Sequence, residues 1–175
     1  MRPRQETKGY EMKKLTVICL ASLSLFACTK GVDPEPTPSP LTSGVQRQAD
    51  IYAAVIGGGE KYGDLWIVDQ ICPDAGQPSD HKGCTPMSAD LKAALLERFP
   101  AARFTSDPQP MQDRLMEKGG VTINWVGPMV GSWDTVQVPS GYWCGGLCGS
   151  GGIKVVEFKN GEWKVTGSVG GTWVS

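Results

Sequence analysis

From Val121 onward the chain alternates apolar and polar side chains, in short runs separated by glycine and proline: VTINWV, DTVQV, IKVVEF, EWKVTG and TWVS. Successive side chains of a strand point to opposite faces, so a period of two predicts β-strands. Asn160-Gly161, between two of the runs, is a strong signal for a two-residue hairpin turn. We therefore expect an antiparallel meander in the second half of the chain.

Three helices are expected before this meander, and the third is a short one over residues 110–118 that ends at Gly119. Residues 44–56 place four apolar side chains on one helical stripe: Val45, Ala49, Tyr52 and Ile56. Residues 89–99 follow a Ser88 cap and carry Leu91, Leu95 and Phe99 on one face. The apolar, β-branched segment 64–71 reads as a strand between them. This order predicts an α+β fold in which N-terminal helices pack on one face of a C-terminal antiparallel sheet.

The start of the chain has the pattern of an export signal. An apolar run over residues 15–27 follows two lysines, and it is long enough for a signal-peptide core but too short for a membrane-spanning helix. Residues 1–11 contain two acidic side chains, which such signals usually avoid, so Met12 is the expected initiator. We interpret residues 1–27 as a signal peptide and exclude them from the fold.

The segment LFAC at residues 25–28 resembles the bacterial lipobox, in which the cysteine is acylated and becomes the first mature residue. Cys28 is that cysteine here, and cleavage of a plain secreted protein nearby is the alternative. Residues 28–43 contain four alternating prolines, which favour an extended tether. Residues 44–175 then form a single globular domain. Thr29 follows the cysteine, and by resemblance to sorting signals this favours the outer membrane where a cell has two.

The expected partners follow from charge. Without residues 1–27 the chain keeps twelve Lys and Arg and sixteen Asp and Glu, a net charge of about −4. An acidic chain lacks the basic face that nucleic-acid binding requires, so no nucleic acid is expected. We expect membrane attachment through the acyl chain on Cys28, and binding of a protein, a glycan or a small ligand by the folded domain.

Four cysteines remain besides Cys28 and Cys19 of the signal peptide, and export exposes them to oxidation: Cys72, Cys84, Cys144 and Cys148. Four cysteines allow three pairings. Pairing of neighbours along the chain is the simplest because each disulfide then closes its own loop, worth roughly 3 and 2 kcal/mol on the loop-closure model. Crossed pairing stays open at this point.

The segment CGGLC at residues 144–148 allows three interpretations. A disulfide that closes a glycine-rich hairpin tip is favoured, because a redox centre usually has two intervening residues at a helix start. A thiol-disulfide redox protein using Cys144 and Cys148 is one alternative. A metal site is the other, with weak candidate ligands in the first cysteine loop, namely Cys72, His81 and Cys84. No cofactor and no metal are expected.

Residues 143–175 resemble the C-terminal signature of a group of uncharacterised bacterial secreted proteins and lipoproteins. In that signature a G-x-L-C-G-x-G turn leads into V-x-E/K-x-x-x-G-x-W-x-V and a final W-x-S, as WCGGLCGSGGIKVVEFKNGEWKVTGSVGGTWVS does here. The resemblance implies a small α+β domain of the cystatin-like or NTF2-like kind. It implies no activity and no catalytic residues.

Catalytic signatures are missing from the sequence: it has no G-x-S-x-G, no Walker loop and no H-E-x-x-H. The expected function is therefore a non-catalytic binding or structural module of the cell envelope. The alternative is a small NTF2-like hydrolase or isomerase with a pocket acid. Its pocket would be lined by Trp66 and Trp125 around Asp69.

The first prediction concerns the anchor. Mass spectrometry of protein purified from membranes should find Cys28 as an acylated N-terminus. Recovery of an unmodified chain that retains residues 12–27, or of a chain that begins after Cys28, would contradict the lipobox interpretation.

Overall fold

The computed structural model describes residues 44–57, 64–77, 82–110, 112–113 and 120–174, which all belong to the compact unit Pro38–Ser175. Cys28 and the remainder of the predicted signal peptide and tether lie outside the described residues, as do residues 111 and 114–119 of the predicted short helix. The elements follow in this order: α1 (Gly44–Ile56), β1 (Asp64–Ile71), β2 (Thr85–Pro86), α2 (Ala89–Arg98), β3 (Arg103–Thr105), β4 (Val121–Val126), β5 (Val130–Gly131), β6 (Thr135–Trp143), β7 (Gly149–Lys159) and β8 (Glu162–Val174).

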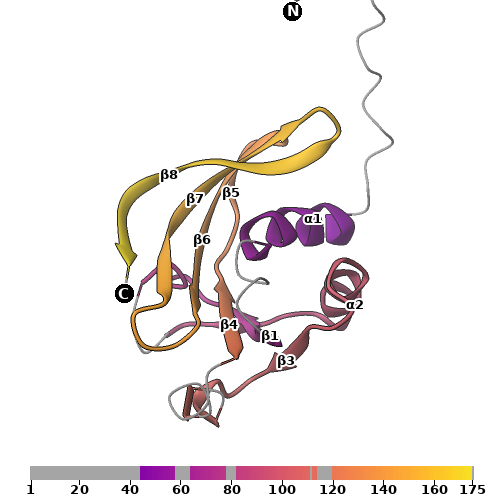
Figure 1. The fold of residues 1–175 in the computed structure, drawn as a ribbon. Coiled ribbons are helices and arrows are strands. Elements are labelled where there is room, and N and C mark those ends of the chain that lie inside the picture. The colour runs from indigo at the N-terminus through magenta and orange to yellow at the C-terminus, as the bar shows by residue number, and fades with distance from the viewer. Residues whose placement is uncertain (1–43, 58–63, 78–81, 111, 114–119, 175) are drawn as a thin grey trace, which may run out of the picture. The chain divides into compact units, whose positions relative to one another are not determined.

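The strands form one mixed sheet, drawn in Figure 1, with the order β2-β1-β4-β6-β7-β8. β3 pairs with β1 and β5 pairs with β6. The expected α+β class with disulfides is confirmed, but the sheet is not purely antiparallel, because β1 runs parallel to β3 and β4. Parallel neighbours need a long crossover, and the chain between β1 and β4 contains α2 and β3.

The meander in the second half is present as expected. β6, β7 and β8 pair antiparallel in sequence order, and β8 is an edge of the sheet. Asn160 and Gly161 connect β7 to β8 with φ angles of 55° and 85°. Two consecutive positive φ angles are what a type I′ hairpin turn requires, so the predicted turn is confirmed.

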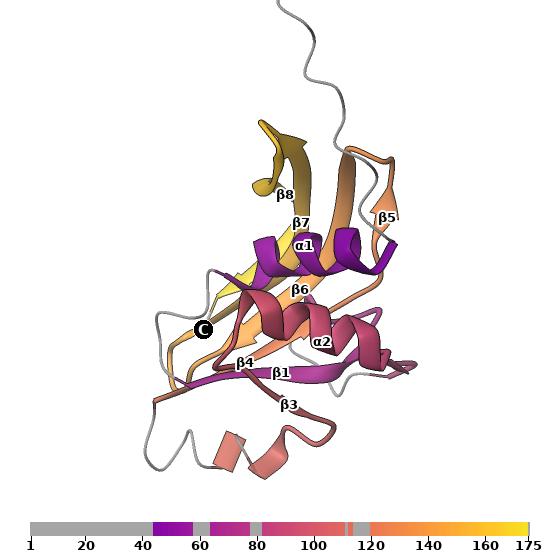
Figure 2. The same ribbon diagram turned by 90° about the vertical axis from the view of Figure 1, so that its right-hand side faces the viewer.

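The helices lie side by side, as Figure 2 shows, and bury their apolar stripes in one hydrophobic cluster with the strands. The predicted stripe of α1 is buried at Ala49, Tyr52 and Ile56. At the start of α2 the Leu91 N–H donates to the Ser88 hydroxyl at 3.2 Å, which confirms the predicted cap. Neither helix is long and apolar enough to cross a membrane, within the part of the chain that the structure describes.

The sheet carries two apolar clusters, and they use alternate residues of β1. Leu65 and Ile67 belong to the cluster that contains the helices. Trp66 and Val68 belong to a second, smaller cluster, together with Val121, Ile123 and Trp125 of β4. Because both clusters cover it, every residue of β4 is buried.

A patch of glycines in β6 and β7 receives the backbone of the loop that follows Cys72. A Cβ added to Gly141 would lie 2.7 Å from the Ala75 carbonyl oxygen, and one added to Gly76 would lie 2.5 Å from the Gly152 oxygen. The Trp173 indole N–H of β8 donates to the Gly76 carbonyl at 2.8 Å. Glycine is needed at this contact because two backbones approach too closely for side chains.

This contact predicts a difference between two glycine-to-alanine variants of strand residues. Gly141→Ala should lower the free energy of unfolding by about 1–3 kcal/mol, because the new methyl group overlaps the Ala75 carbonyl. Gly167→Ala is the matched control, since nothing lies within 4 Å of its Cβ position. Chemical denaturation should find the control unchanged or more stable by up to about 1 kcal/mol. Equal effects would contradict the close contact.

Candidate ligand-binding site

A cavity of about 260 Å³ lies between the last turn of α1 and the sheet. Ten residues from α1, β4, β6, β7 and β8 line it: Ala54, Val55, Ile56, Asn124, Trp125, Ser140, Gly141, Tyr142, Lys154 and Val165. Its size is just below the usual range for pockets that hold small molecules. Most of its wall is apolar, and a few polar groups interrupt that wall, which is the usual construction of a ligand site.

The cavity lies where α1 ends and where β6 carries small residues. α1 ends at Ile56, and its last three residues, Ala54, Val55 and Ile56, form one wall of the cavity. β6 contributes Ser140, whose small side chain does not fill the space beneath the helix end. Gly141 also borders the cavity, but it is fixed as glycine by its contact with the Ala75 backbone on the other side of the sheet.

Three polar side chains are buried among the described residues, and two of them line the cavity. Thr122 is 0 %, Asn124 3 % and Ser140 5 % exposed. In the antiparallel pairing of β4 with β6, Asn124 lies opposite Tyr142 and Val126 lies opposite Ser140. Residues directly opposite share a face of the sheet, so these side chains form one polar spot in an apolar interior.

Two polar atoms in this spot lack a hydrogen-bond partner. They are the Thr122 hydroxyl oxygen and the Asn124 amide nitrogen. A buried polar group without a partner costs about 1–3 kcal/mol, so most proteins satisfy such groups with protein atoms or ordered water. Because Asn124 borders a cavity, a bound molecule can supply the missing acceptor.

Lys154 adds the only cationic side chain among the described residues that line the cavity. It lies on β7 opposite Val138, which is fully buried in the cluster of the helices. Its ammonium lies 3.5 Å from the Ser168 hydroxyl, and it forms no ion pair with any described residue. No carboxylate, histidine or free thiol is found among the described lining residues, so the site offers amide and hydroxyl groups and one positive charge.

The three ligand-binding candidates from the sequence do not all line this cavity. Trp66 and Trp125 belong to the second cluster, and Arg103 packs over the Trp66 ring at 5.5 Å. The Asp69 carboxylate instead reaches Lys92 of α2, at 3.4 Å. Of the three, Trp125 alone borders the cavity.

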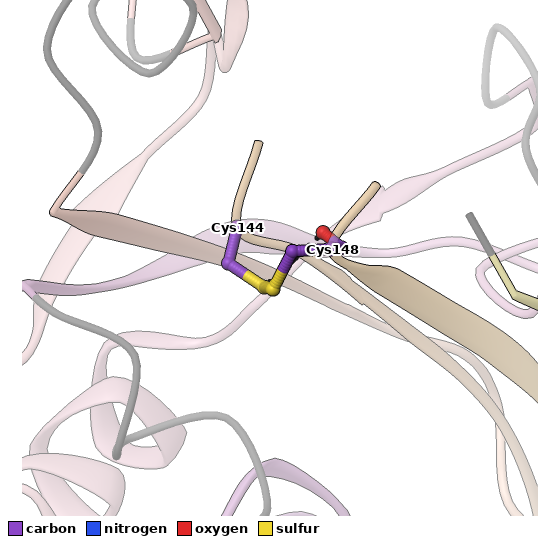
Figure 3. The surroundings of a disulfide bond; sticks show 2 residues. All are labelled: Cys144 and Cys148. Carbon is purple, nitrogen blue, oxygen red and sulfur yellow. Dashed lines mark hydrogen bonds between the residues drawn. A yellow bond between two sulfur atoms is a disulfide. The ribbon is translucent and has the colours of Figure 1, made fainter. Parts of the chain in front are cut away.

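Disulfides join Cys72 to Cys84 and Cys144 to Cys148, which is the adjacent pairing. Figure 3 shows the second disulfide, which joins the residue after β6 to the residue before β7 and so closes the hairpin tip. The Cys144 N–H donates to the Cys148 carbonyl at 2.7 Å, and no helix begins at either cysteine. The helix N-terminus at which redox-active cysteine pairs usually lie is therefore not present at this hairpin tip.

The alternative metal site loses two of its ligands to the first disulfide. Cys72 and Cys84 are bonded to each other and offer no thiolate to a metal ion. His81, the third candidate, lies outside the described residues. Within the described ranges no group of three potential metal ligands is found.

Sequence reasoning missed Asn124, Ser140, Tyr142 and Lys154. The alternation in VTINWV predicts a strand but not which of its faces is buried, and the structure covers both faces of β4. No local signal marks Asn124, because an amide between Ile123 and Trp125 fits a solvent-facing strand position equally well. Periodicity alone does not tell a solvent face from a second buried face.

The orphaned hydroxyl at Thr122 predicts a gain in stability when it is removed. Thr122→Val keeps the side-chain shape and should raise the free energy of unfolding by about 1 kcal/mol, because an unsatisfied polar group disappears. Thr105→Val is the matched control, since the Thr105 hydroxyl bonds both the carbonyl and the N–H of Asp107. The control should lose up to about 1 kcal/mol in the same denaturation experiment. A comparable loss for Thr122→Val would show that its hydroxyl has a partner.

No protein-family model matches this sequence, and neither a curated protein nor a solved structure is similar to it. The arguments about the fold and the cavity therefore depend on the residues of this chain alone. The resemblance of residues 143–175 to secreted proteins and lipoproteins stays a prediction.

Proposed function

We propose that this protein is a lipid-anchored module of the bacterial cell envelope that binds a small ligand without catalysing a reaction. The observation that carries the proposal is the buried amide nitrogen of Asn124, which has no hydrogen-bond partner and belongs to a residue lining a cavity of about 260 Å³. Such a donor gains its partner when a ligand enters. The cavity between α1 and the sheet is the binding site in this proposal.

The envelope location is supported by the N-terminal segment and by the disulfides of the folded domain. The signal-like run over 15–27, the lipobox-like LFAC and the proline-rich tether support export and an acyl anchor on Cys28. The two disulfides fit an oxidising compartment outside the cytoplasm. Thr29 after the anchor favours the outer membrane in a cell with two membranes, facing the periplasm or the surface. The ligand site is thus carried some distance from the bilayer.

We also propose that the two helices form a layer over one face of the sheet. This proposal is supported by the cluster that α1 and α2 share with Leu65 and Ile67 of β1 and with Val136, Val138 and Val156 of the meander. In that arrangement the cavity opens between the helix layer and the strands. This is where an NTF2-like fold, one of the two kinds that the C-terminal resemblance implies, would hold a ligand.

A catalytic alternative finds less support. A hydrolase or isomerase with Asp69 as its base would need that carboxylate beside the substrate, but Asp69 pairs with Lys92 and does not line the cavity. A thiol-disulfide redox protein would need a reactive thiol at Cys144 or Cys148, which sit in a hairpin tip. Binding requires neither group, and we prefer it for that reason.

Heteronuclear NMR of the full chain, with both disulfides formed, tests the binding site. Mixtures of neutral, cationic and anionic fragments of fewer than about a dozen heavy atoms should shift the amide resonances of Asn124, Ser140 and Lys154. Val165→Trp should abolish these shifts, because Val165 lines the cavity from the exposed strand β8 and an indole would fill it.

Lys164→Trp is the matched control, because Lys164 pairs with Glu162 on the exposed strand and does not line the cavity. It should leave the fragment shifts intact. Shifts that persist in Val165→Trp, or the lack of any shift at the cavity with all three fragment classes, would refute the proposed site.

A further inference from the structure

Every polar group that the described side chains bring to the cavity can donate a hydrogen bond. The Asn124 amide nitrogen is unsatisfied, and Ser140 and Tyr142 carry hydroxyl groups. Lys154 adds three N–H donors and a positive charge. A ligand with an acceptor oxygen and one negative charge complements the Asn124 amide nitrogen and the Lys154 ammonium.

The charge that the site can neutralise is small. Lys154 is the single cation among the described lining residues, and no arginine accompanies it. The C-terminal turn of α1 also borders the cavity, and a helix C-terminus carries a partial negative charge that opposes anions nearby. A dianion such as phosphate would therefore be poorly matched, whereas a single carboxylate directed away from α1 is well matched.

The apolar residues determine where the uncharged part of the ligand lies. Ala54, Val55 and Ile56 of α1 form one wall. Lys154 and Val165 come from the neighbouring strands β7 and β8. The negative group thus belongs at the β7 side and the apolar body against the helix.

We infer that the cavity binds a small organic monocarboxylate, with its carboxylate at Lys154 and its apolar body against the end of α1. The inference rests on the proposed binding function and deepens it by naming the ligand class. The Asn124 amide nitrogen, which is buried and has no hydrogen-bond partner, then donates to an acceptor oxygen of the ligand. The hydrogen bond between the Lys154 ammonium and a carboxylate is charge-assisted. Such a bond is about twice as strong as a neutral one, so the preference for an acid should be measurable.

The test compares three probes of equal chain length on the full chain: hexanoate, hexanamide and hexylamine. NMR titration should give hexanoate a dissociation constant of about millimolar order, as expected for so few heavy atoms. It should bind roughly tenfold more tightly than hexanamide, because the charged contact with Lys154 is lost in the amide. Hexylamine should bind most weakly.

Two lysine variants locate the charge. Lys154→Met should remove the tenfold preference for hexanoate over hexanamide, while Lys164→Met, the same change outside the cavity, should preserve it. An N-acetylated tetrapeptide ending in leucine distinguishes a peptide C-terminus from a free acid as the source of the carboxylate. Saturable binding of either acid that depends on Lys154 supports the inference.

The result that would overturn the inference is binding of all three probes at the cavity with equal affinity, or a preference for hexylamine. Either outcome leaves the proposed binding function standing, because the probes would still bind at the cavity and only the preference for a carboxylate would be missing. The absence of any shift at the cavity, with these probes and with the broader fragment mixtures, would refute both.

Discussion

The burial of α1 is the constraint on which the other elements depend. Ala49, Ile51 and Tyr52 have no exposed surface, and the helix contacts α2, β6, β7 and β8. The Tyr52 hydroxyl donates to the Gly127 carbonyl at 3.0 Å, and burial raises the pKa of this phenol, so it stays protonated as a donor. Polar contacts at the helix surface fix its direction: Arg98 of α2 binds Asp50 at 2.6 Å. A helix held on so many sides has one register against the sheet.

That fixed position also determines where the cavity lies. The N-terminal half of α1 is held against the loop before β6, because Arg47 donates to the carbonyls of Ser132 and Trp133. Its guanidinium also stacks 5.0 Å from the ring centre of Trp163 on β8. The helix is therefore packed at one end, and the unfilled volume remains at the other, next to Ile56.

Local features of the sequence predicted the local features of the fold. The α1 stripe, the Ser88 cap and the Asn160-Gly161 turn each depend on residues a few positions apart, and all three are present. The parallel pairing of β1 with β4 was not predictable in this way, because about fifty residues separate the strands and no local pattern specifies the partner. The sequence predicted the role of only some of the glycines in CGGLCGSGG. Gly145 serves the turn, whereas Gly151 and Gly152 make room for Trp173, Thr172 and the loop at Gly76.

The same difference explains why the site could not be predicted. Trp66, Asp69 and Trp125 were chosen for their residue types, and the structure directs Asp69 to Lys92 and the tryptophans to the second cluster. Recognising Asn124 would have required knowing that β4 lies between two covered faces, which depends on strand order and not on the strand itself. Buried polar residues become visible as a site only when the three-dimensional neighbours are known.

The unsatisfied polar atoms of Thr122 and Asn124 affect both the stability of the fold and the free energy of ligand binding. Thr122 and Asn124 each leave a buried polar atom unsatisfied, which lowers the free energy of unfolding. The Cys72–Cys84 and Cys144–Cys148 disulfides oppose this by restricting the unfolded chain, and they do so away from the cavity lining. A ligand that satisfies Asn124 binds the folded state alone and therefore adds its binding free energy to stability. In the proposed binding function the disulfides thus supply stability at a distance from the cavity, and the ligand supplies the acceptor that the Asn124 amide nitrogen lacks.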